Sequence, residues 1–414
     1  LFIDGGGIRG LSSLQVLWNL MREIQLSEHL EKMPLPCECF DLIGGTSTGG
    51  IIALMLGRLR MSVDDALHKY AQLSKDVFSD EKFLGDGAFK ASNLEAAIKK
   101  VISAQPAAMH DSEARMRDDA PSGGLCRTFV CVTAPVALGS PTPTLFRTYE
   151  PRHERFINCK IWEAARATSA APTFFKPIEI DNGFGILSRY TDGGIGHNNP
   201  AGVVLHEASS IFPERKIACM ISIGTGKLKV SRLDRPGFIQ RIMPRIDVAV
   251  AIVKIVTDCE TVAEDMEHRF HDSPGVYFRF NVDQGMDGVK LSDWDKLDVV
   301  HDVTEMYLRS TTVSKTMTDA AAAVRARRGV APTVQASMFC SLYFLKFHLT
   351  HSGNRWCASE GCCSFEACCD PQTLPSFNTV FHGERLHSLE NDSILLWKVR
   401  AASYICGSRP GRQW

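Results

Sequence analysis

The chain has 414 residues, with 46 lysines and arginines against 47 aspartates and glutamates and a formal net charge of −1. This balance leaves no basic excess to neutralise phosphates, so we expect no nucleic acid partner. No apolar run approaches the roughly 20 residues of a membrane-spanning helix, so we expect no transmembrane segment and contact with a membrane only at its surface.

The first sixty residues contain one local pattern twice: an apolar strand, a glycine-rich turn and a helix. Leu1-Phe-Ile-Asp4 leads into Gly5-Gly-Gly-Ile-Arg-Gly10, and apolar residues then recur at helical spacing to about residue 27. Phe40-Asp-Leu-Ile43 leads into Gly44-Gly-Thr-Ser-Thr-Gly-Gly50, and an apolar helix is predicted over 51–59.

Helical and strand patterns alternate along the chain to about residue 330. Helices are predicted over 63–77, 93–102, 161–168 and 200–210, and strands over 128–133, 144–149, 189–192 and 217–223. Residues 240–328 are predicted to be helical apart from a strand over 276–281. This alternation predicts a three-layer α/β/α sandwich with a mostly parallel central sheet.

The segment Gly45-Thr-Ser47-Thr-Gly49 fits the Gly-x-Ser-x-Gly nucleophile elbow, in which a serine sits on a sharp strand-to-helix turn. Gly45 and Gly49 are needed because side chains there would clash across the turn. The helix start also offers backbone N–H groups to a developing oxyanion. A glycine-rich helix cap without catalysis is the alternative, and the flanking strand and helix favour Ser47 as a nucleophile.

The segment Asp4-Gly-Gly-Gly-Ile-Arg-Gly10 presents successive N–H groups at a helix start, as an oxyanion or phosphate cradle requires. The spacing Gly5-x-Gly7-x-x-Gly10 also matches a dinucleotide-binding fingerprint, but no acidic residue ends a second strand about 20 residues later. A P-loop is excluded because no Lys-Ser/Thr follows the glycines. Arg9 is interpreted as a brace for the loop, with phosphate binding as the alternative.

Asp192-Gly-Gly194 ends the strand predicted at 189–192. An aspartate followed by two glycines can direct its carboxylate into a site with little steric cover. Taken alone, the segment is more typical of a plain Asp-Gly turn. Its meaning therefore depends on the two glycine-rich motifs that precede it.

The three motifs in this order resemble the signature blocks of patatin-like phospholipases. Three further segments also resemble that family, namely Trp162-Glu-Ala-Ala-Arg-Ala-Thr-Ser-Ala-Ala-Pro-Thr-Phe-Phe175, Asn199-Pro200 and Ser222-Ile-Gly-Thr-Gly226. The resemblance extends over residues 1–226 and more weakly to about 330.

This resemblance implies a Ser–Asp dyad in place of a Ser-His-Asp triad. Ser47 would attack an ester carbonyl, Asp192 would take its proton, and water would release the fatty acid from an acyl-enzyme. The oxyanion hole would be formed by backbone N–H groups of the glycine loop, centred on Gly6, Gly7 and Ile8, within the segment Gly5, Gly6, Gly7, Ile8, Arg9 and Gly10. The family uses neither a metal nor another cofactor for this chemistry.

A histidine-containing triad is the main alternative for the site, because an α/β-hydrolase has its histidine after the acid. The histidines that follow Asp192 are His197, His206, His268 and His271. His197 lies five residues after Asp192 and is interpreted as a residue of the pocket rim. Ser169, at the end of a helix rich in small residues, is interpreted as a packing residue.

The 14 cysteines divide into two groups. Seven lie between Cys37 and Cys259 in mostly apolar surroundings, as expected for buried thiols in a reducing compartment. The other seven lie in residues 340–414, which lack paired Cys-x-x-Cys spacing, so a zinc site with His348 or His351 is the less favoured interpretation. We predict a catalytic core over 1–226, a helical part of the same domain over 227–330 and a cysteine-rich extension over 331–414.

The predicted function is hydrolysis of fatty-acyl ester bonds in phospholipids or related glycerolipids at a membrane surface. A general serine esterase or thioesterase is one alternative. The other is a sensing or interaction module with little catalysis, because patatin-like domains are often joined to further domains in larger proteins. A cytoplasmic location, peripheral to membranes, follows from the scattered cysteines and the absence of a spanning segment.

Overall fold

The computed structural model of the protein describes residues 1–80, 88–105, 111–119, 126–134, 143–172, 174–227, 259–326 and 331–332. All of them belong to one compact unit, Leu1–His348. The helical pattern predicted over 240–258 and the cysteines of 340–414 lie outside the described residues. The boundaries predicted at 226 and 330 stay predictions.

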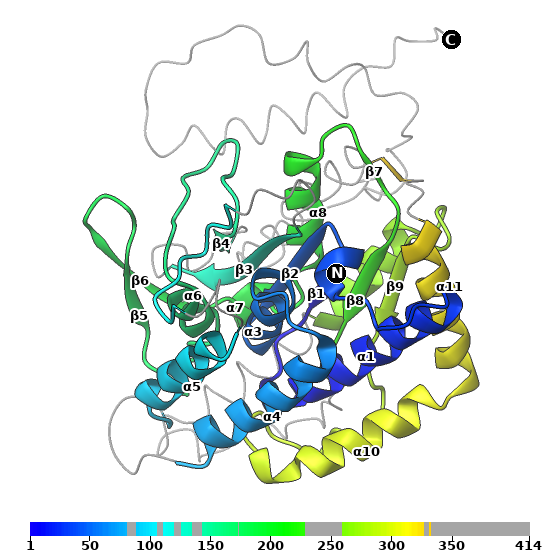
Figure 1. The fold of residues 1–414 in the computed structure, drawn as a ribbon, viewed down its shortest axis with the longest axis horizontal. Helices are drawn as coiled ribbons and strands as arrows, with labels where there is room; N and C mark the ends of the chain where they lie inside the picture. The colour runs from blue at the N-terminus through cyan, green and yellow to red at the C-terminus, as the bar shows by residue number, and fades with distance from the viewer. Residues whose placement is uncertain are drawn as a thin grey trace, which may run out of the picture. The chain divides into compact units, whose positions relative to one another are not determined.

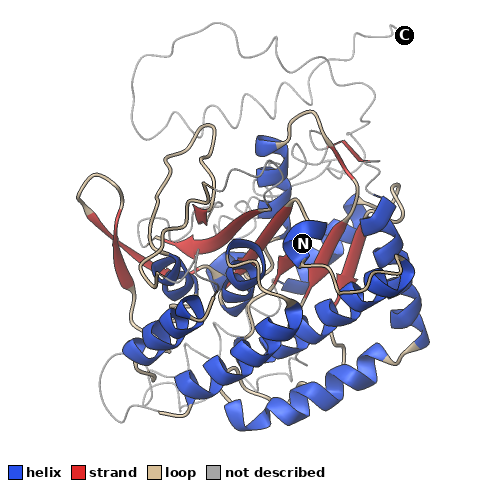
Figure 2. Ribbon diagram, viewed as in Figure 1, coloured by secondary structure: helices blue, strands red, loops and turns tan. Residues whose placement is uncertain are grey.

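A twisted mixed sheet forms the centre of this unit (Figure 1, Figure 2). Its main path has the order β5-β6-β3-β2-β1-β8-β9, and β4 also pairs with β3. Neighbours from β3 to β9 along this path are parallel, whereas β4 and β6 pair antiparallel with β3 and β5 pairs antiparallel with β6. The strands are β1 (Phe2–Ile3), β2 (Leu42–Thr46), β3 (Arg127–Thr133), β4 (Thr144–Arg147), β5 (Ile178–Asp181), β6 (Leu187–Asp192), β8 (Met220–Ile223) and β9 (Tyr277–Phe280).

The described fold also contains ten helices. They are the helices α1 (Gly10–Ser27), α2 (Pro36–Cys39), α3 (Thr48–Ala53), α4 (Val63–Phe78), α5 (Ala91–Ser103), α6 (Ile161–Thr168), α7 (Gly194–His197), α8 (Ala201–Ile211), α10 (Leu297–Leu308) and α11 (Thr311–Ala326). Short helical turns lie at η1 (Gly7–Arg9), η2 (Leu54–Arg58) and η6 (Trp294–Lys296), and a separate two-stranded ladder joins β7 (Lys216–Ile217) to β10 (Ala331–Pro332). Among the described helices, none has both the length and the apolar character to cross a bilayer.

Alternating side chains on the strands divide the core into two layers of packing. Val130 and Val132 of β3 pack in a large cluster with α1, α3, α4 and α5, whereas Phe129 and Cys131 pack in a second cluster with Val204 of α8. This two-residue period is the one that a strand buried on both faces requires. The predicted α/β/α sandwich is therefore confirmed, with a mixed sheet.

Helix α4 illustrates how local sequence sets these elements. It begins after Ser62, whose side chain accepts a hydrogen bond from the backbone N–H of Asp65 and caps the helix. Ala66, Tyr70 and Leu73 are buried at helical spacing, so one face packs into the core while charged residues cover the other.

The β5–β6 hairpin is the main departure from the predicted elements. The prediction contained a strand only at 189–192, and β5 was missed because Ile178–Asp181 is four residues long and follows a proline. The hairpin also makes this edge of the sheet antiparallel. A second, smaller difference is the helix predicted over 51–59, which begins earlier, at Thr48, and ends in the wider turn η2.

Candidate active site

Ser47 occupies a strained turn between β2 and α3. Its φ of 56° and ψ of −128° lie in a region that residues with a side chain rarely adopt. The turn is tight on both sides, because a Cβ at Gly45 would lie 2.2 Å from the Gly49 carbonyl oxygen and one at Gly49 would lie 2.3 Å from that of Ile3. The geometry is that of a nucleophile elbow, which presents a serine hydroxyl at the end of a strand.

Strand register brings Asp192 beside this serine. Thr46 pairs with Cys131 on one side of β3, and Asp192 pairs with Val132 on the other side. Ser47 and Asp192 therefore flank the same level of β3, at the carboxyl ends of the parallel strands. This is the edge at which open α/β sheets bind their ligands.

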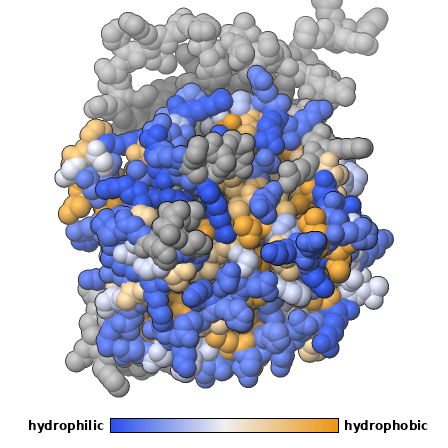
Figure 3. All heavy atoms as spheres, in the orientation of Figure 1, coloured by the Kyte–Doolittle hydropathy of each residue, from blue (hydrophilic) through white to orange (hydrophobic). Residues whose placement is uncertain are grey.

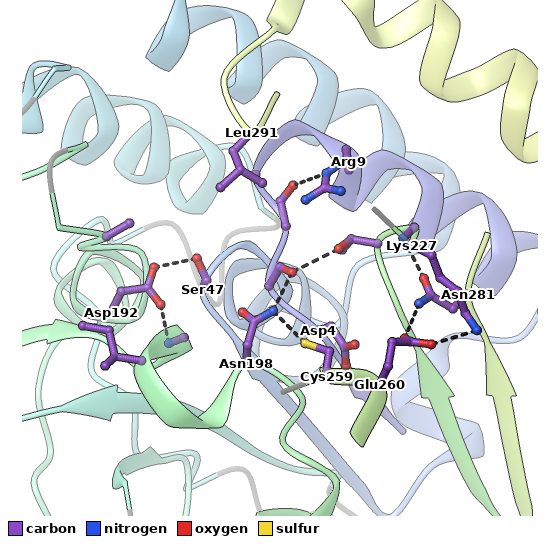
Figure 4. Close-up of a pocket in the computed structure, with 18 of the residues that line it drawn as sticks. Asp4, Arg9, Ser47, Asp192, Asn198, Lys227, Cys259, Glu260, Asn281 and Leu291 are labelled. Atoms are coloured by element: carbon purple, nitrogen blue, oxygen red, sulfur yellow. Dashed lines mark hydrogen bonds and ion pairs between the residues drawn. The ribbon is translucent and has the colours of Figure 1, made fainter. Parts of the chain in front are cut away.

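The two side chains make a direct hydrogen bond (Figure 4). Ser47 Oγ donates to Asp192 Oδ2 at 2.6 Å, and the backbone N–H of Gly194 donates to Asp192 Oδ1 at 2.7 Å. Asp192 is 3% exposed, and this burial raises the pKa of its carboxyl to about 7 even though both hydrogen bonds oppose the shift. A carboxylate with a pKa near neutrality, in contact with a hydroxyl, is suited to general-base chemistry.

Thr168 at the end of α6 holds the backbone of the nucleophile. Its Oγ1 accepts a hydrogen bond from the Ser47 N–H at 2.9 Å and donates to the Cys131 carbonyl at 2.7 Å. Thr168 thus ties α6, β3 and the turn together. Thr168 lies within the segment Trp162–Phe175 that resembles the family, but no pattern in the sequence predicts this role for it.

The N–H groups of the glycine loop are unequal. Gly5 N–H bonds the Asn198 carbonyl, Gly6 N–H bonds Thr48 Oγ1 and Ile8 N–H bonds the Leu291 carbonyl. Gly7 N–H has no acceptor among the described residues, and Gly7 lines the same cavity as Ser47. Of the three central residues predicted for an oxyanion hole, Gly7 is therefore the one with a free donor at the site.

Side chains from several elements fix the carbonyl groups of the same loop. Gly5 O accepts from Asn198 Nδ2 at 3.1 Å and from Thr225 Oγ1 at 3.0 Å. Gly6 O accepts from the buried Arg9 Nε at 3.4 Å, and Gly7 O accepts from the Tyr70 hydroxyl at 2.6 Å. Because these carbonyl groups accept hydrogen bonds from the surrounding side chains, the loop is held in one orientation. The predicted role of Arg9 as a brace for the loop stays a prediction, which this contact with Gly6 O supports.

We expect Gly7→Ala to lower turnover by about 10²–10³-fold, the usual cost of losing one oxyanion donor. Gly7 has a φ of +57°, and a Cβ there would lie 2.1 Å from the Leu291 carbonyl oxygen, so the loop must move. Gly275→Ala is the matched control, because Gly275 has a φ of +80° but no atom within 4 Å of its Cβ position. Ester turnover and urea unfolding of both variants test this, and full turnover in a folded Gly7→Ala protein would exclude Gly7 as the donor.

A buried charged group lies behind the glycine loop. Asp4, which follows β1, pairs with Arg279 of β9 at 2.7 Å, and both side chains are less than 10% exposed. Arg279 also donates to Ser222 Oγ at 2.8 Å, while Glu260 pairs with Lys227 at 2.8 Å. These contacts connect the start of the glycine loop to β8 and β9, so the sheet helps to hold the loop in position.

The catalytic candidates open into one cavity of about 170 Å³. The glycine loop, Ser47 and Asp192 form part of its wall, and Pro172 and Ile195 add exposed apolar surface. Asn198, Cys259 and Glu260 line another part (Figure 4). In the part of the chain that the structure describes, no cluster of three or more His, Cys, Asp or Glu side chains is arranged to hold a metal ion.

None of the described histidines that follow Asp192 lies between the Ser47 hydroxyl and the Asp192 carboxylate. The direct contact between Ser47 and Asp192 leaves no space for an imidazole between them. His197 is half-buried, and burial lowers its pKa to about 4, while its backbone carbonyl accepts from Thr46 Oγ1. His206, His268 and His271 are exposed and do not line the cavity.

Several known proteins with sequences similar to this chain are named phospholipases. Calcium-independent phospholipase A2-gamma of Homo sapiens is 31% identical over 299 residues, covering 68% of this chain and 34% of that protein. Phospholipase A I of Arabidopsis thaliana is 25% identical over 354 residues, covering 71% and 25%. The cGAMP-activated phospholipase of Vibrio cholerae is 29% identical over 238 residues, covering 55% and 63%.

The chain spans about a third of the length of the phospholipase A2-gamma proteins it matches. The family model described as patatin-like phospholipase matches residues 1–205, which contain the glycine loop, the elbow and Asp192. The chain is therefore a member of the patatin-like phospholipase family.

Proposed function

We propose that the protein is a serine lipid acyl hydrolase that cleaves fatty-acyl ester bonds of phospholipids or related glycerolipids. The observation that carries this proposal is the 2.6 Å hydrogen bond from Ser47 Oγ to the buried Asp192 carboxylate. The free N–H of Gly7 in the same cavity supports it. The names of the relatives, all phospholipases, support a lipid ester as the substrate.

In the first half of the reaction, Asp192 takes the hydroxyl proton as Ser47 Oγ attacks the ester carbonyl. The tetrahedral oxyanion lies against Gly7 N–H, and the N-terminus of α3 adds its positive dipole end. The protonated Asp192 then donates to the departing alcohol, which leaves an acyl group on Ser47. Water attacks this ester, Asp192 accepts the proton of the water, and the fatty acid is released as the serine regains its proton.

The setting of this activity is part of the proposal. The described cysteines are free thiols, which supports a reducing, cytoplasmic location with peripheral contact to membranes. We place the catalytic core at 1–226, its helical continuation at 227–330 and an extension at 331–414. Because these relatives are much longer than this chain, we also propose that the chain is joined to, or works with, further domains in a larger protein.

The rate is expected to rise with pH through about 7. Asp192 acts as a base only when ionised, and its pKa is raised to about 7 by burial. Below that value kcat/KM falls about tenfold per pH unit, so that it is about 100-fold lower near pH 5. A kcat/KM profile on a monomeric short-chain ester tests this, and a profile that is flat down to about pH 5 would contradict Asp192 as the base.

Fatty-acid release from long-chain phosphatidylcholine in the presence of a chelator tests the proposed function. The wild type should release fatty acid from phospholipid and should cleave a monomeric short-chain ester, both without added metal. Cleavage of the short-chain ester alone would indicate a general esterase. A folded protein that cleaves neither would overturn the proposal in favour of an interaction module.

A further inference from the structure

The β5–β6 hairpin carries an apolar tip that the proposed chemistry does not use. Its large side chains are highly exposed, with Phe184 at 73%, Ile186 at 60% and Leu187 at 65%. Figure 1 shows the hairpin extending away from the helices at the left of the view, and Figure 3 shows hydrophobic surface at that edge. We propose that this tip inserts into a lipid surface and holds the active site against it, an inference that rests on the proposed function.

The hairpin projects on the side of the active site. β6 pairs with β3 at Asp192↔Val132 and Thr191↔Thr133, and β3 ends there. The rest of the hairpin therefore extends beyond the carboxyl edge of the sheet, at which Ser47 lies. At ~3.3 Å per residue, Leu187 lies roughly 17 Å along the strand from Asp192. Past Asp192, Ile195 at the cavity wall is also partly exposed.

Hydrogen bonds within the hairpin hold its tip in one conformation. Asn182 N–H bonds the Ile186 carbonyl at 3.0 Å and closes the loop around Phe184. The Asp181 carboxylate accepts hydrogen bonds from the N–H groups of Gly183 at 2.7 Å and Gly185 at 3.0 Å. These hydrogen bonds hold the turn in one conformation, so its apolar side chains stay exposed to solvent.

The charges of the hairpin favour a lipid surface. The Asp181 carboxylate accepts hydrogen bonds within the turn, and Glu179 pairs with Arg189 at 3.1 Å across the two strands. The Arg155 guanidinium lies 2.9 Å from the Phe184 ring centroid and pairs with no carboxylate among the described residues. A cation beside inserted apolar side chains can stay at the level of the phosphate groups while its stem lies on the apolar surface.

The size of the patch argues against a protein partner. Stable protein interfaces use about 20–30 residues on each side, whereas three side chains on a narrow turn provide a small contact. Insertion into lipid needs no such area, because the transfer of each apolar side chain from water into lipid lowers the free energy. A phospholipid substrate held in the adjacent cavity makes the membrane surface the consistent occupant.

The test compares the full chain with a triple variant, Phe184→Ser, Ile186→Ser and Leu187→Ser. We expect the variant to lose at least about tenfold in partitioning to sedimented phosphatidylcholine vesicles. Hydrolysis of vesicle phospholipid should fall in parallel, while turnover of a monomeric short-chain ester stays at the wild-type level. Met306→Ser is the matched control, because Met306 is also 73% exposed but lies on α10, and it should change neither quantity.

Several outcomes would overturn this inference. Unchanged vesicle binding in a triple variant with normal short-chain turnover would exclude insertion of the tip. If that variant instead changed the oligomeric state in sedimentation velocity, the tip would contact a second copy of the chain. Failure of the proposed function is distinguishable, because it would abolish ester turnover in the wild type while leaving hairpin-dependent vesicle binding measurable.

Discussion

Ser47→Ala is expected to lower ester turnover by about 10⁴-fold or more, which is the scale found when a serine nucleophile is removed from a hydrolase. The reason is that the variant has no group to form the acyl-enzyme, although Gly7 N–H and the cavity remain. Substrate binding should change little. The measurement is kcat/KM on a short-chain ester together with the size of the burst in the first turnover.

Ser169→Ala is the matched control for this prediction. Ser169 lies one residue beyond Thr168, is 5% exposed, and its hydroxyl makes no hydrogen bond among the described residues. Its removal should leave turnover within about twofold of wild type, since small changes without lost contacts usually have small effects. Comparable losses in both variants would mean that the elbow serine has no special role.

Asp192→Asn is expected to lower turnover by about 10⁴-fold, comparable to the loss of the orienting carboxylate in a serine protease triad. Asparagine can keep the contacts with Gly194 and Ser47, but it cannot accept the hydroxyl proton. Replacement of the exposed Asp272 by asparagine is the control, with wild-type turnover expected. Substantial residual turnover in Asp192→Asn would move the base to another residue.

The same variant should be more stable than wild type above about pH 7. Burial raises the pKa of Asp192 to about 7 in the folded protein, against about 3.9 for an unfolded aspartate. The protonated carboxyl is therefore favoured by folding, and its contribution to stability is fully present below about pH 4 and is lost as the pH rises through about 7. Asparagine carries no such penalty.

The expected gain in unfolding free energy is a few kcal/mol above about pH 7, at 1.36 kcal/mol per pKa unit. It should shrink toward zero below about pH 3, where the wild-type side chain is neutral in both states. Urea unfolding at both pH values measures the difference. Equal stability at high pH would show that the Asp192 carboxylate is well solvated, and its role as a tuned base would lose support.

The sequence predicted the parts of the fold that depend on local patterns. Both strand–turn–helix units occur where the glycine clusters and apolar runs indicated, as do α4, α5, α6 and β3. β5 was missed, although Asp181-Asn-Gly183 is a turn sequence that precedes the strand into Asp192. A short strand after a proline has too little alternation to stand out from a loop.

The candidate site was only partly predictable, for a related reason. Ser47 and Asp192 could be proposed from motifs, but their contact depends on register through β3, over 145 residues of chain. The choice of Gly7 over Gly6 as the free donor depends on Thr48, which takes the Gly6 N–H. The Asp4–Arg279 pair joins residues 275 positions apart, and no local pattern indicates it.

Labelling with a fluorophosphonate serine probe tests whether Ser47 and Asp192 form the catalytic pair. We expect one modified residue, Ser47, in the folded wild type, no labelling in Ser47→Ala, and much slower labelling in Asp192→Asn. We also expect the labelling rate to fall as the pH drops below about 7, because Asp192 must be ionised. A folded wild type that does not label, or that labels at another serine, would contradict the assignment of Ser47 and Asp192 as the catalytic pair.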